Sequence, residues 1–172
     1  SSAIADVFVP RIVSAYEANG VEVRGDETVC RMTDAIPATS EDWDTEYGDL
    51  IISIKVGGSL QDAVDFINAH GSHHTDAIVT KDVRRAAAFA RSVDSADVFV
   101  NASTRFADGY RYGKGAEVGI STNKIHARGP VGMEGLMIYK YVLVGNGQVV
   151  KDYVGPGCRP FKHTPSNVPY PY

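Results

Sequence analysis

The feature that most constrains this fold is a near-continuous apolar run, rich in β-branched residues, at positions 50–56. Such a run is typical of a strand that is buried on both faces of a parallel sheet. A glycine pair ends it, Ser59 then stands where a helix N-cap is expected, and Asp62 follows three residues later, as in a capping box. The sequence therefore predicts a strand that leads directly into a helix, which Gly71 closes.

Strand and helix patterns also alternate on both sides of this unit. Upstream, a helical spacing at 4–16, interrupted by Pro10, precedes a short strand pattern at 21–24, and 26–44 is polar and reads as a connector. Downstream, the chain reads as a strand at 77–80, a helix at 82–91 and a strand at 98–100. Strands separated by single helices predict an α/β fold with an open parallel sheet and right-handed helical crossovers.

The last third of the chain differs from the rest in composition and pattern. It becomes glycine-rich after Asn101, and apolar runs at 139–144 and 148–150 then flank Asn146-Gly147, a strong signal for a β-hairpin. An isolated hairpin is barely stable, so this one is expected to pair with another subunit. Five of the eight prolines follow Gly155. The sequence thus divides into a folded part at 1–136, a hairpin at 137–154 and an extended tail at 155–172.

Composition excludes several classes of protein. The 172 residues are 44% hydrophobic, with a net charge of -4 and dispersed basic residues, which argues against nucleic acid or an acidic membrane surface as partner. No apolar run approaches the ~20 residues of a membrane helix. Cys30 and Cys158 form neither a disulfide framework nor a zinc motif, so we expect no metal site and a reducing cytoplasm.

Two clusters of polar residues flank predicted strands. His73 and His74 precede one strand. Two interpretations have equal weight: either ring supplies a hydrogen bond to a substrate, or one histidine caps a helix end and the other is exposed. The second cluster, 101–105, follows a strand and ends in Arg105, whose guanidinium suits a carboxylate or phosphate. A surface ion pair with Asp108 is an equal alternative for that arginine.

Two apparent motifs are rejected. The glycines of 113–119 resemble a dinucleotide fingerprint, but the third is one position late and no helical pattern follows. Cys30 has no histidine or helix start nearby in sequence to activate its thiol, so a buried, inert cysteine is favoured.

Several long motifs closely resemble those of gamma-glutamyl phosphate reductases (glutamate-5-semialdehyde dehydrogenases), which belong to the aldehyde dehydrogenase superfamily. The resemblance runs from about residue 4 to residue 147, and the motifs that carry it are 46–56, 71–80, 93–106, 115–122 and 126–130. It implies that 1–136 is part of an aldehyde dehydrogenase-like catalytic domain and that 139–150 is the oligomerisation hairpin of a homo-oligomer.

The resemblance also implies an activity: NADPH-dependent reduction of L-glutamyl 5-phosphate to L-glutamate 5-semialdehyde and phosphate, in proline biosynthesis. In that chemistry a cysteine thiolate displaces phosphate to give a thioester, which a hydride then reduces. The family's nucleophilic cysteine aligns before Ser1. We therefore expect no catalytic residue in this chain, which reads as a C-terminal fragment that is inactive alone.

By the same resemblance, Glu46 matches the superfamily glutamate that contacts the nicotinamide ribose. The residues that the resemblance places in the substrate funnel are His73, His74, Asn101, Ser103, Thr104 and Arg105. Two alternatives stay open: a non-catalytic binding or oligomerisation module derived from the family, and the reductase domain of a bifunctional pyrroline-5-carboxylate synthase.

Overall fold

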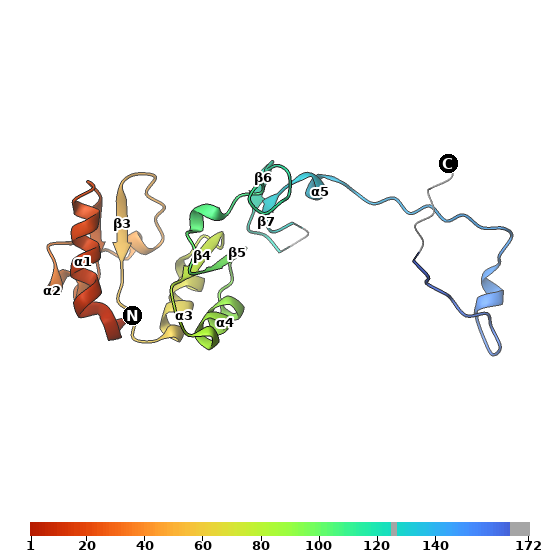
Figure 1. The fold of residues 1–172 in the computed structure, drawn as a ribbon, viewed down its shortest axis with the longest axis horizontal. Helices are drawn as coiled ribbons and strands as arrows, with labels where there is room; N and C mark the ends of the chain where they lie inside the picture. The colour runs from red at the N-terminus through yellow and green to blue at the C-terminus, as the bar shows by residue number, and fades with distance from the viewer. Residues whose placement is uncertain (125–126, 166–172) are drawn as a thin grey trace. The chain divides into compact units, whose positions relative to one another are not determined.

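The computed structural model describes residues 1–124 and 127–165, in two compact units. The first unit is Ser1–Met137 and the second is Ile138–Tyr172. Every strand assigned in the described residues belongs to the first unit, where helices accompany the strands (Figure 1). The first unit is therefore the part that can position a site.

The amino-terminal part of the first unit is a parallel sheet with helices packed on it. The strands lie in the order β2-β1-β3, and Val23 of β1 stands opposite Ile52 of β3. In chain order the elements are η1 (Ser2–Ile4), α1 (Ala5–Glu17), β1 (Glu22–Gly25), α2 (Glu27–Met32), β2 (Ile36–Pro37), η2 (Glu41–Trp43) and β3 (Ile51–Ile54). Helix α1 continues through Pro10.

A valine-rich core joins α1 and α2 to this sheet. Val9 and Val13 are four residues apart, so they lie on one face of α1, and they pack with Val23 of β1 and Val29 of α2. Each fully buried valine stabilises the fold by about 1.5 kcal/mol or more. Glycine at position 25 allows Val29 to pack closely against β1, because a Cβ there would lie 2.5 Å from Cγ1 of Val29.

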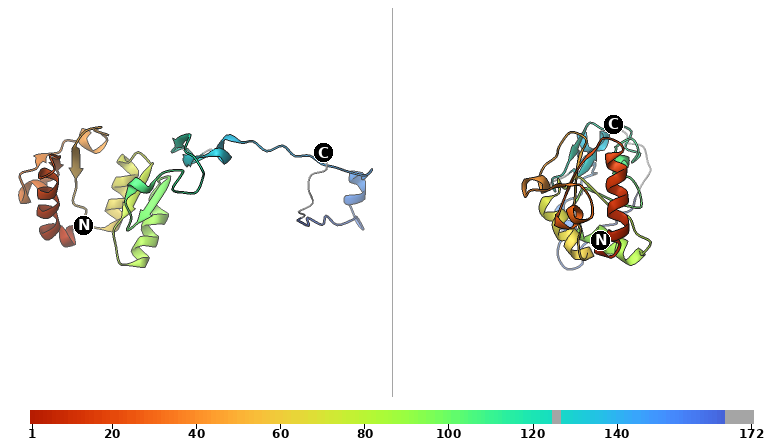
Figure 2. Two further views of the ribbon diagram at one scale, coloured as in Figure 1. Left: turned by 45° about the horizontal axis from the view of Figure 1, so that its top comes forward. Right: turned by 90° about the vertical axis from the view of Figure 1, so that its left-hand side faces the viewer.

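A second parallel pair of strands follows, again with helices beside it (Figure 2). Thr75 of β4 stands opposite Asp97 of β5, and Val64, Phe89 and Val93 form the core beneath them. The elements are α3 (Leu60–His70), β4 (Thr75–Ile78), α4 (Val83–Ser92) and β5 (Asp97–Val100).

Side-chain caps explain where these two helices begin. The hydroxyl of Ser59 accepts a hydrogen bond from the backbone N–H of Asp62 at 3.0 Å, as the sequence predicts. The carboxylate of Asp82 accepts from the backbone N–H of Arg84 at 2.9 Å and of Arg85 at 3.3 Å.

The rest of the first unit is irregular, with short elements. They are η3 (Thr104–Phe106), β6 (Gly119–Ser121), β7 (Gly129–Val131) and α5 (Met133–Leu136), and β6 and β7 pair antiparallel. In the second unit the only helix or strand assigned in the described residues is η4 (Val150–Tyr153).

The prediction of a structureless connector at 26–44 is wrong. Asp26 caps α2 through Val29 N–H at 2.9 Å, and its other oxygen accepts from Val56 N–H, also at 2.9 Å, just after β3. One carboxylate thus starts a helix and ties it to the sheet. A capping Asp followed by Glu27 is a helix-start signal that the polar character of the segment obscured.

The predicted α/β fold with parallel pairing is confirmed, with two differences. The first difference is that the described parallel strands form two separate sheets: β3 pairs with β1, and β4 pairs with β5. The predicted hairpin at 139–150 is not formed, since the described residues there contain no strand and η4 begins at Val150. Tyr141 and Leu143 are 95% and 97% exposed, which agrees with the expectation that a two-stranded hairpin is barely stable without a third strand to pair with.

Across residues 1–124 and 127–165, no helix is long and apolar enough to span a membrane. The same residues contain no group of three or more His, Cys, Asp or Glu side chains that could hold a metal ion. His126, part of one family-like motif, and residues 166–172 of the predicted tail lie outside the described residues.

Candidate functional site

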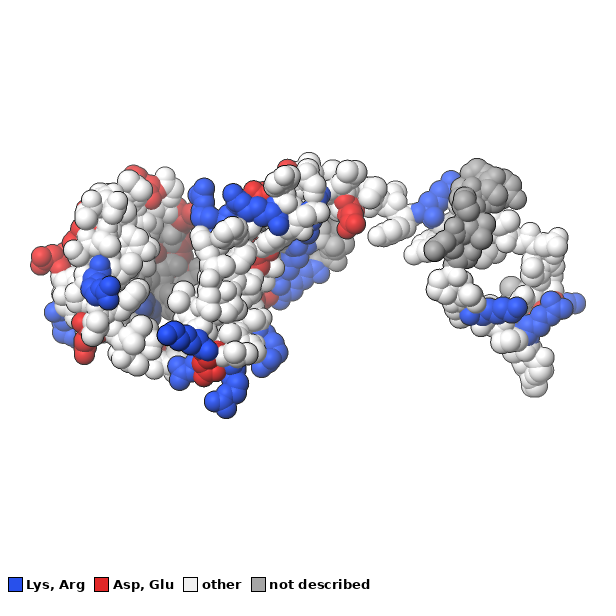
Figure 3. Space-filling model, in the orientation of Figure 1, with Lys and Arg blue, Asp and Glu red and all other residues white. Residues whose placement is uncertain are grey.

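Charge alone does not reveal a site. Lys and Arg side chains are spread over several elements of the face in Figure 3, with acidic residues between them. The geometry around the β4–β5 pair is more informative. Backbone N–H groups of Ala96 and Asp97 donate to the carbonyls of His73 and His74 at 2.9 Å, which fixes both histidines at the start of β4.

A cavity of about 440 Å³ opens beside the first residues of β4. Its lining includes His74 and Thr75 from the start of the strand, Thr104 and Arg105 from η3, and Arg111 from the turn that follows. Two guanidinium groups and an imidazole therefore border one space, together with the carboxylate of Asp108. Such a donor set matches an anion, because guanidinium binds carboxylate and phosphate bidentately.

Arg105 and Arg111 have different surroundings. Arg111 donates to the backbone carbonyl of Arg105 and lies 3.7 Å from the carboxylate of Asp108. It also lies over the ring of Phe106, 5.9 Å from the ring centroid. The side chain of Arg105 makes no hydrogen bond or ion pair in the described part of the chain, so the Asp108 pairing considered for Arg105 is found instead at Arg111. Arg105 is therefore available to a ligand.

Three of the predicted substrate residues are instead engaged with the backbone. The Nδ1 atom of His73 lies 2.7 Å from the carbonyl of Asp94, and the residue adopts a φ of 60°. Asn101, with a φ of 55°, accepts from the N–H of Thr80 and donates to its carbonyl, both at 2.8 Å. These contacts tie together the carboxyl ends of β4 and β5. Ser103 caps η3 through the N–H of Arg105.

The structure therefore brings His74, Thr104 and Arg105 to one cavity and leaves His73, Asn101 and Ser103 outside its lining. The cavity begins at the amino end of β4, where His74 lies, although Thr104 and Arg105 follow the carboxyl end of β5 in sequence. The reason is that the chain after β5 turns back, so that η3 contacts β4.

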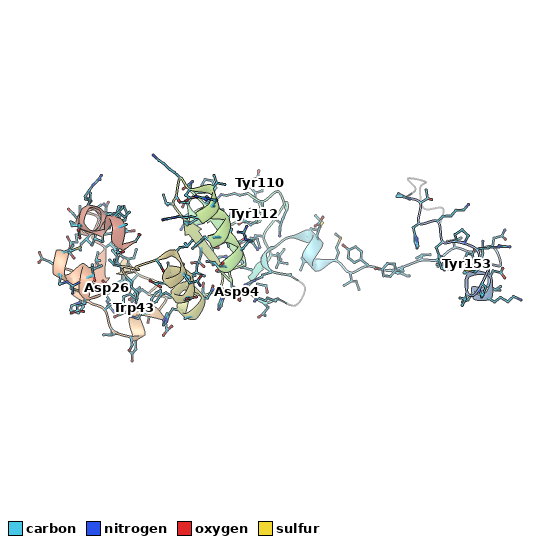
Figure 4. All side chains as sticks on the ribbon, turned by 90° about the horizontal axis from the view of Figure 1, so that it is seen from below. Asp26, Trp43, Asp94, Tyr110, Tyr112 and Tyr153 are labelled. Atoms are coloured by element: carbon cyan, nitrogen blue, oxygen red, sulfur yellow. The ribbon has the colours of Figure 1, made fainter. Side chains whose placement is uncertain are left out.

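Glu46 lies elsewhere, exposed between Thr45 and Tyr47. Both of these neighbours line a second cavity of about 520 Å³, and Glu46 itself does not. In the lining of this cavity the ammonium of Lys55 lies 5.2 Å from the ring centroid of Trp43 and 4.6 Å from that of Phe66 (Trp43 is labelled in Figure 4). Glu46 is thus an exposed residue whose two sequence neighbours line an aromatic cavity that also holds a cation.

A buried carboxylate holds the segment that carries Glu46. Asp42 accepts from the backbone N–H of Thr39 at 2.7 Å, from Arg24 at 2.6 Å and from the hydroxyl of Tyr47 at 2.8 Å. These hydrogen bonds, with the Thr39 N–H first, hold the pKa of Asp42 well below its usual range. The same contact with Asp42 raises the pKa of Arg24, so the pair stays charged at neutral pH.

Neither cysteine is placed as a nucleophile. The thiol of Cys30 lies 3.3 Å from the carbonyl of Gly25 and 3.4 Å from that of Ala35, where it acts as a weak donor within the α2 region. Cys158 is exposed in the second unit. The sequence predicted a buried, inert Cys30; in the structure the residue is only partly buried, and its thiol contacts backbone carbonyls.

Sequence reasoning missed a cluster that anchors the glycine-rich segment. Asp94, labelled in Figure 4, lies 2.7 Å from Lys124 and 2.9 Å from Arg128. The hydrogen bond from Lys124, and then that from Arg128, lowers the pKa of Asp94. It also missed Arg111, Asp97 and Tyr112, because Asp97 is well separated in sequence from Arg111 and Tyr112, and only the fold brings them close together.

Comparison with known proteins is consistent across sequence and structure. No family profile matches the chain. It is 58% identical over 166 residues to the gamma-glutamyl phosphate reductase of Methanosarcina barkeri, covering 93% of this chain and 37% of that protein. The reductase of a Synechococcus strain is 59% identical over 163 residues, covering 94% and 36%.

A solved structure agrees with these relatives. The crystal structure of the gamma-glutamyl phosphate reductase of Thermotoga maritima superposes with a TM-score of 0.82 at 47% identity, over 86% of this chain and 36% of that one. The chain thus spans little more than a third of the length of the curated relatives that it matches.

Proposed function

This chain belongs with the gamma-glutamyl phosphate reductases, and we propose that it forms the substrate-binding part of such an enzyme. The proposed reaction is the NADPH-dependent reduction of L-glutamyl 5-phosphate to L-glutamate 5-semialdehyde and phosphate, a step of proline biosynthesis in the cytoplasm. The identity to the curated relatives supports the assignment of the reaction.

The observation that carries the proposal is the cavity beside β4. L-Glutamyl 5-phosphate carries a carboxylate and a phosphoryl group, and both are oxyanions. Arg105, Arg111 and His74 border a single space of about 440 Å³, which is adequate for a small anionic ligand. We assign anion binding to Arg105 first, because Arg111 already has Asp108 nearby.

We assign Glu46 to the binding of a nicotinamide cofactor. Its carboxylate is exposed and makes no hydrogen bond in the described residues, so it can accept bonds from ribose hydroxyls. NADPH would supply the hydride that reduces the acyl group. In this proposal Glu46 orients the ribose, and the Asp42 hydrogen bonds hold the loop that carries Glu46.

We place the nucleophilic cysteine outside these 172 residues. Cys30 contacts two carbonyls in the α2 region, and neither cysteine lines the candidate cavity. The deciding experiment compares two proteins: the full-length protein and residues 1–172 alone. NADPH oxidation that depends on L-glutamyl 5-phosphate is expected from the first and not from the second. Turnover by residues 1–172 alone would refute this placement, and no turnover by the full-length protein would refute the reductase assignment.

One observation also supports self-association through 139–150. Tyr139, Tyr141 and Leu143 are each more than 90% exposed, whereas the alternating Val142 and Val144 are 52% and 58% exposed. An exposed apolar segment with strand-like alternation is expected to pair with another strand. A second copy of this chain is the partner that we propose for it.

A further inference from the structure

Two polar atoms behind the candidate anion cavity are buried without a partner. Nε2 of His74 and Oδ2 of Asp97 are both inaccessible to solvent, and neither makes a hydrogen bond within the described residues. They lie 3.9 Å from each other, and Asp97 is only 8% exposed. Buried polar groups normally find partners, so this near-contact calls for an explanation.

The other oxygen of Asp97 is fully engaged. Oδ1 accepts from the hydroxyl of Tyr112 at 2.8 Å; Tyr112 is labelled in Figure 4 on the segment that follows η3. Burial, and then this hydrogen bond, raises the pKa of Tyr112 to about 12, so the phenol remains a donor at neutral pH. Gly129, with a φ of +76°, approaches Asp97 so closely that its added Cβ would lie 3.3 Å from Oδ1.

The charged groups around His74 come from several segments. Asp97 on β5 is negative, Arg105 on η3 and Arg111 in the next turn are positive, and Asp108 lies beside Arg111. Arg128, which precedes Gly129, is held by Asp94. In the free protein the imidazole therefore lies 3.9 Å from the Asp97 carboxylate, and it lines the same cavity as two guanidinium groups and the Asp108 carboxylate.

An anion in the cavity changes this balance. Its negative charge offsets the two guanidinium groups, and the imidazole then lies between the anion and Asp97. Two flanking negative charges favour the protonated ring, whose two N–H groups match the two acceptors. Nε2 lies 3.9 Å from Oδ2 of Asp97, so the proposal below assigns Nδ1 to the ligand.

We propose that His74 takes up a proton from solvent when a divalent tetrahedral oxyanion binds in this cavity, and that Asp97 is the positioning residue that holds the ring for it. The proposal rests on the anion site proposed above and assigns it to the phosphoryl group of the substrate. Proton uptake would make the site favour doubly charged phosphoryl oxyanions over singly charged carboxylates, because the protonated imidazole adds a positive charge beside the two guanidinium groups.

The test uses the full-length protein, with sulfate as probe because sulfate does not titrate near neutral pH. Binding is followed by calorimetry at pH 7.5 in buffers of different ionisation enthalpy, which yields the protons taken up per bound anion. We expect uptake approaching about one proton per sulfate, and its loss in His74→Gln. Acetate is expected to bind without proton uptake. Proton uptake with acetate equal to that with sulfate would overturn the phosphoryl assignment.

Variants separate a positioning role from a structural one. Asp97→Asn is expected to weaken sulfate binding about tenfold and to abolish the uptake, and His74→Gln added to it should cause no further loss. Tyr112→Phe is expected to leave binding within about twofold, since Oδ2 still faces His74. If Tyr112→Phe reproduced the Asp97→Asn loss, Asp97 would be merely an anchor for Tyr112, and the proposal would be wrong.

The outcomes also distinguish the inference from the function on which it rests. Sulfate binding that is insensitive to Arg105→Ala and Arg111→Ala would remove both the anion site and this proposal. A second outcome is sulfate binding that depends on the two arginines but shows no proton uptake dependent on His74. That outcome would keep the anion site and overturn only the proposal made in this section. His74→Gln decides this point even if Asp97→Asn fails to fold. Asp76→Asn, on the neighbouring strand β4 but bonded to Ser95, is the matched control for Asp97→Asn and should change neither quantity.

Discussion

Arg105 is the single residue whose loss should weaken substrate binding most directly. Arg105→Ala in the full-length enzyme is expected to raise the KM for L-glutamyl 5-phosphate about tenfold or more, because a hydrogen bond to a charged group contributes about 1.5–3 kcal/mol. Steady-state kinetics measure the change. Arg84→Ala, at a fully exposed position on α4, is the control and should leave KM unchanged. An unchanged KM in Arg105→Ala would remove this residue from the site.

Asp42 should make stability depend on pH in a defined direction. Its pKa is lowered in the folded protein, so its carboxylate stabilises the fold above the unfolded pKa of about 4, and this contribution is lost as pH falls below that value. Asp42→Asn is therefore expected to lower the Tm at pH 7 by about 3 °C or more, with the difference shrinking toward pH 3.

Thermal unfolding from pH 3 to pH 7 measures this effect. The control is Asp65→Asn, on the exposed face of α3, where the carboxylate accepts only from Gln61 at 2.8 Å. A deficit in Asp42→Asn that is equally large at pH 3 and pH 7 would show that shape, and not charge, accounts for the role of Asp42.

At this scale the sequence identified candidate residues but not how they are arranged. A guanidinium after a strand identified Arg105 as a candidate anion ligand, and the structure places Arg105 in the lining of a cavity. The sequence did not reveal Arg111 or Asp97, because their roles arise from a turn that brings η3 back to β4. Nor did it distinguish His74, which lines the cavity, from His73, whose ring contacts the carbonyl of Asp94.

Among the elements, α3 offers the simplest test of a predicted cap. Ser59→Ala removes the acceptor of the Asp62 N–H and is expected to lower the free energy of unfolding by about 1 kcal/mol. Denaturant unfolding gives this value directly. Ser14→Ala, at an exposed interior position of α1, is the matched control, and should be neutral or slightly stabilising since alanine favours helix. Equal effects of the two variants would mean that the cap does not contribute.

Periodicity predicted the long elements and failed for the short ones. Strands β1, β3 and β5 and helices α1, α3 and α4 lie within a few residues of the expected ranges, because each buries an apolar face that its sequence displays. Helix α2 has six residues, too few for a visible period, and depends on the Asp26 cap. Which strands pair is decided by tertiary packing, so the division into two sheets had no local signal.

For the whole molecule, the exposed segment at 139–150 predicts concentration-dependent association. The double variant Tyr141→Lys, Leu143→Lys is expected to lower the mass measured by light scattering toward that of one chain, because two charges oppose strand pairing at an edge. Val154→Lys, also exposed in the second unit but outside the segment, should keep the parent mass. A double variant of unchanged mass would place the interface elsewhere.

The candidate anion site is local in sequence, which bears on its assembly in the cell. The cavity is lined by residues from His74 to Arg111, and Tyr112, which bonds Asp97, follows at once. A ribosome therefore synthesises the whole site before the apolar stretch that begins at Ile138, and the site emerges from the ribosome first. Since folding proceeds along the emerging chain, a nascent protomer can have a formed ligand site before it exposes a surface that attracts other copies. Synthesis order would then separate site formation from assembly in time.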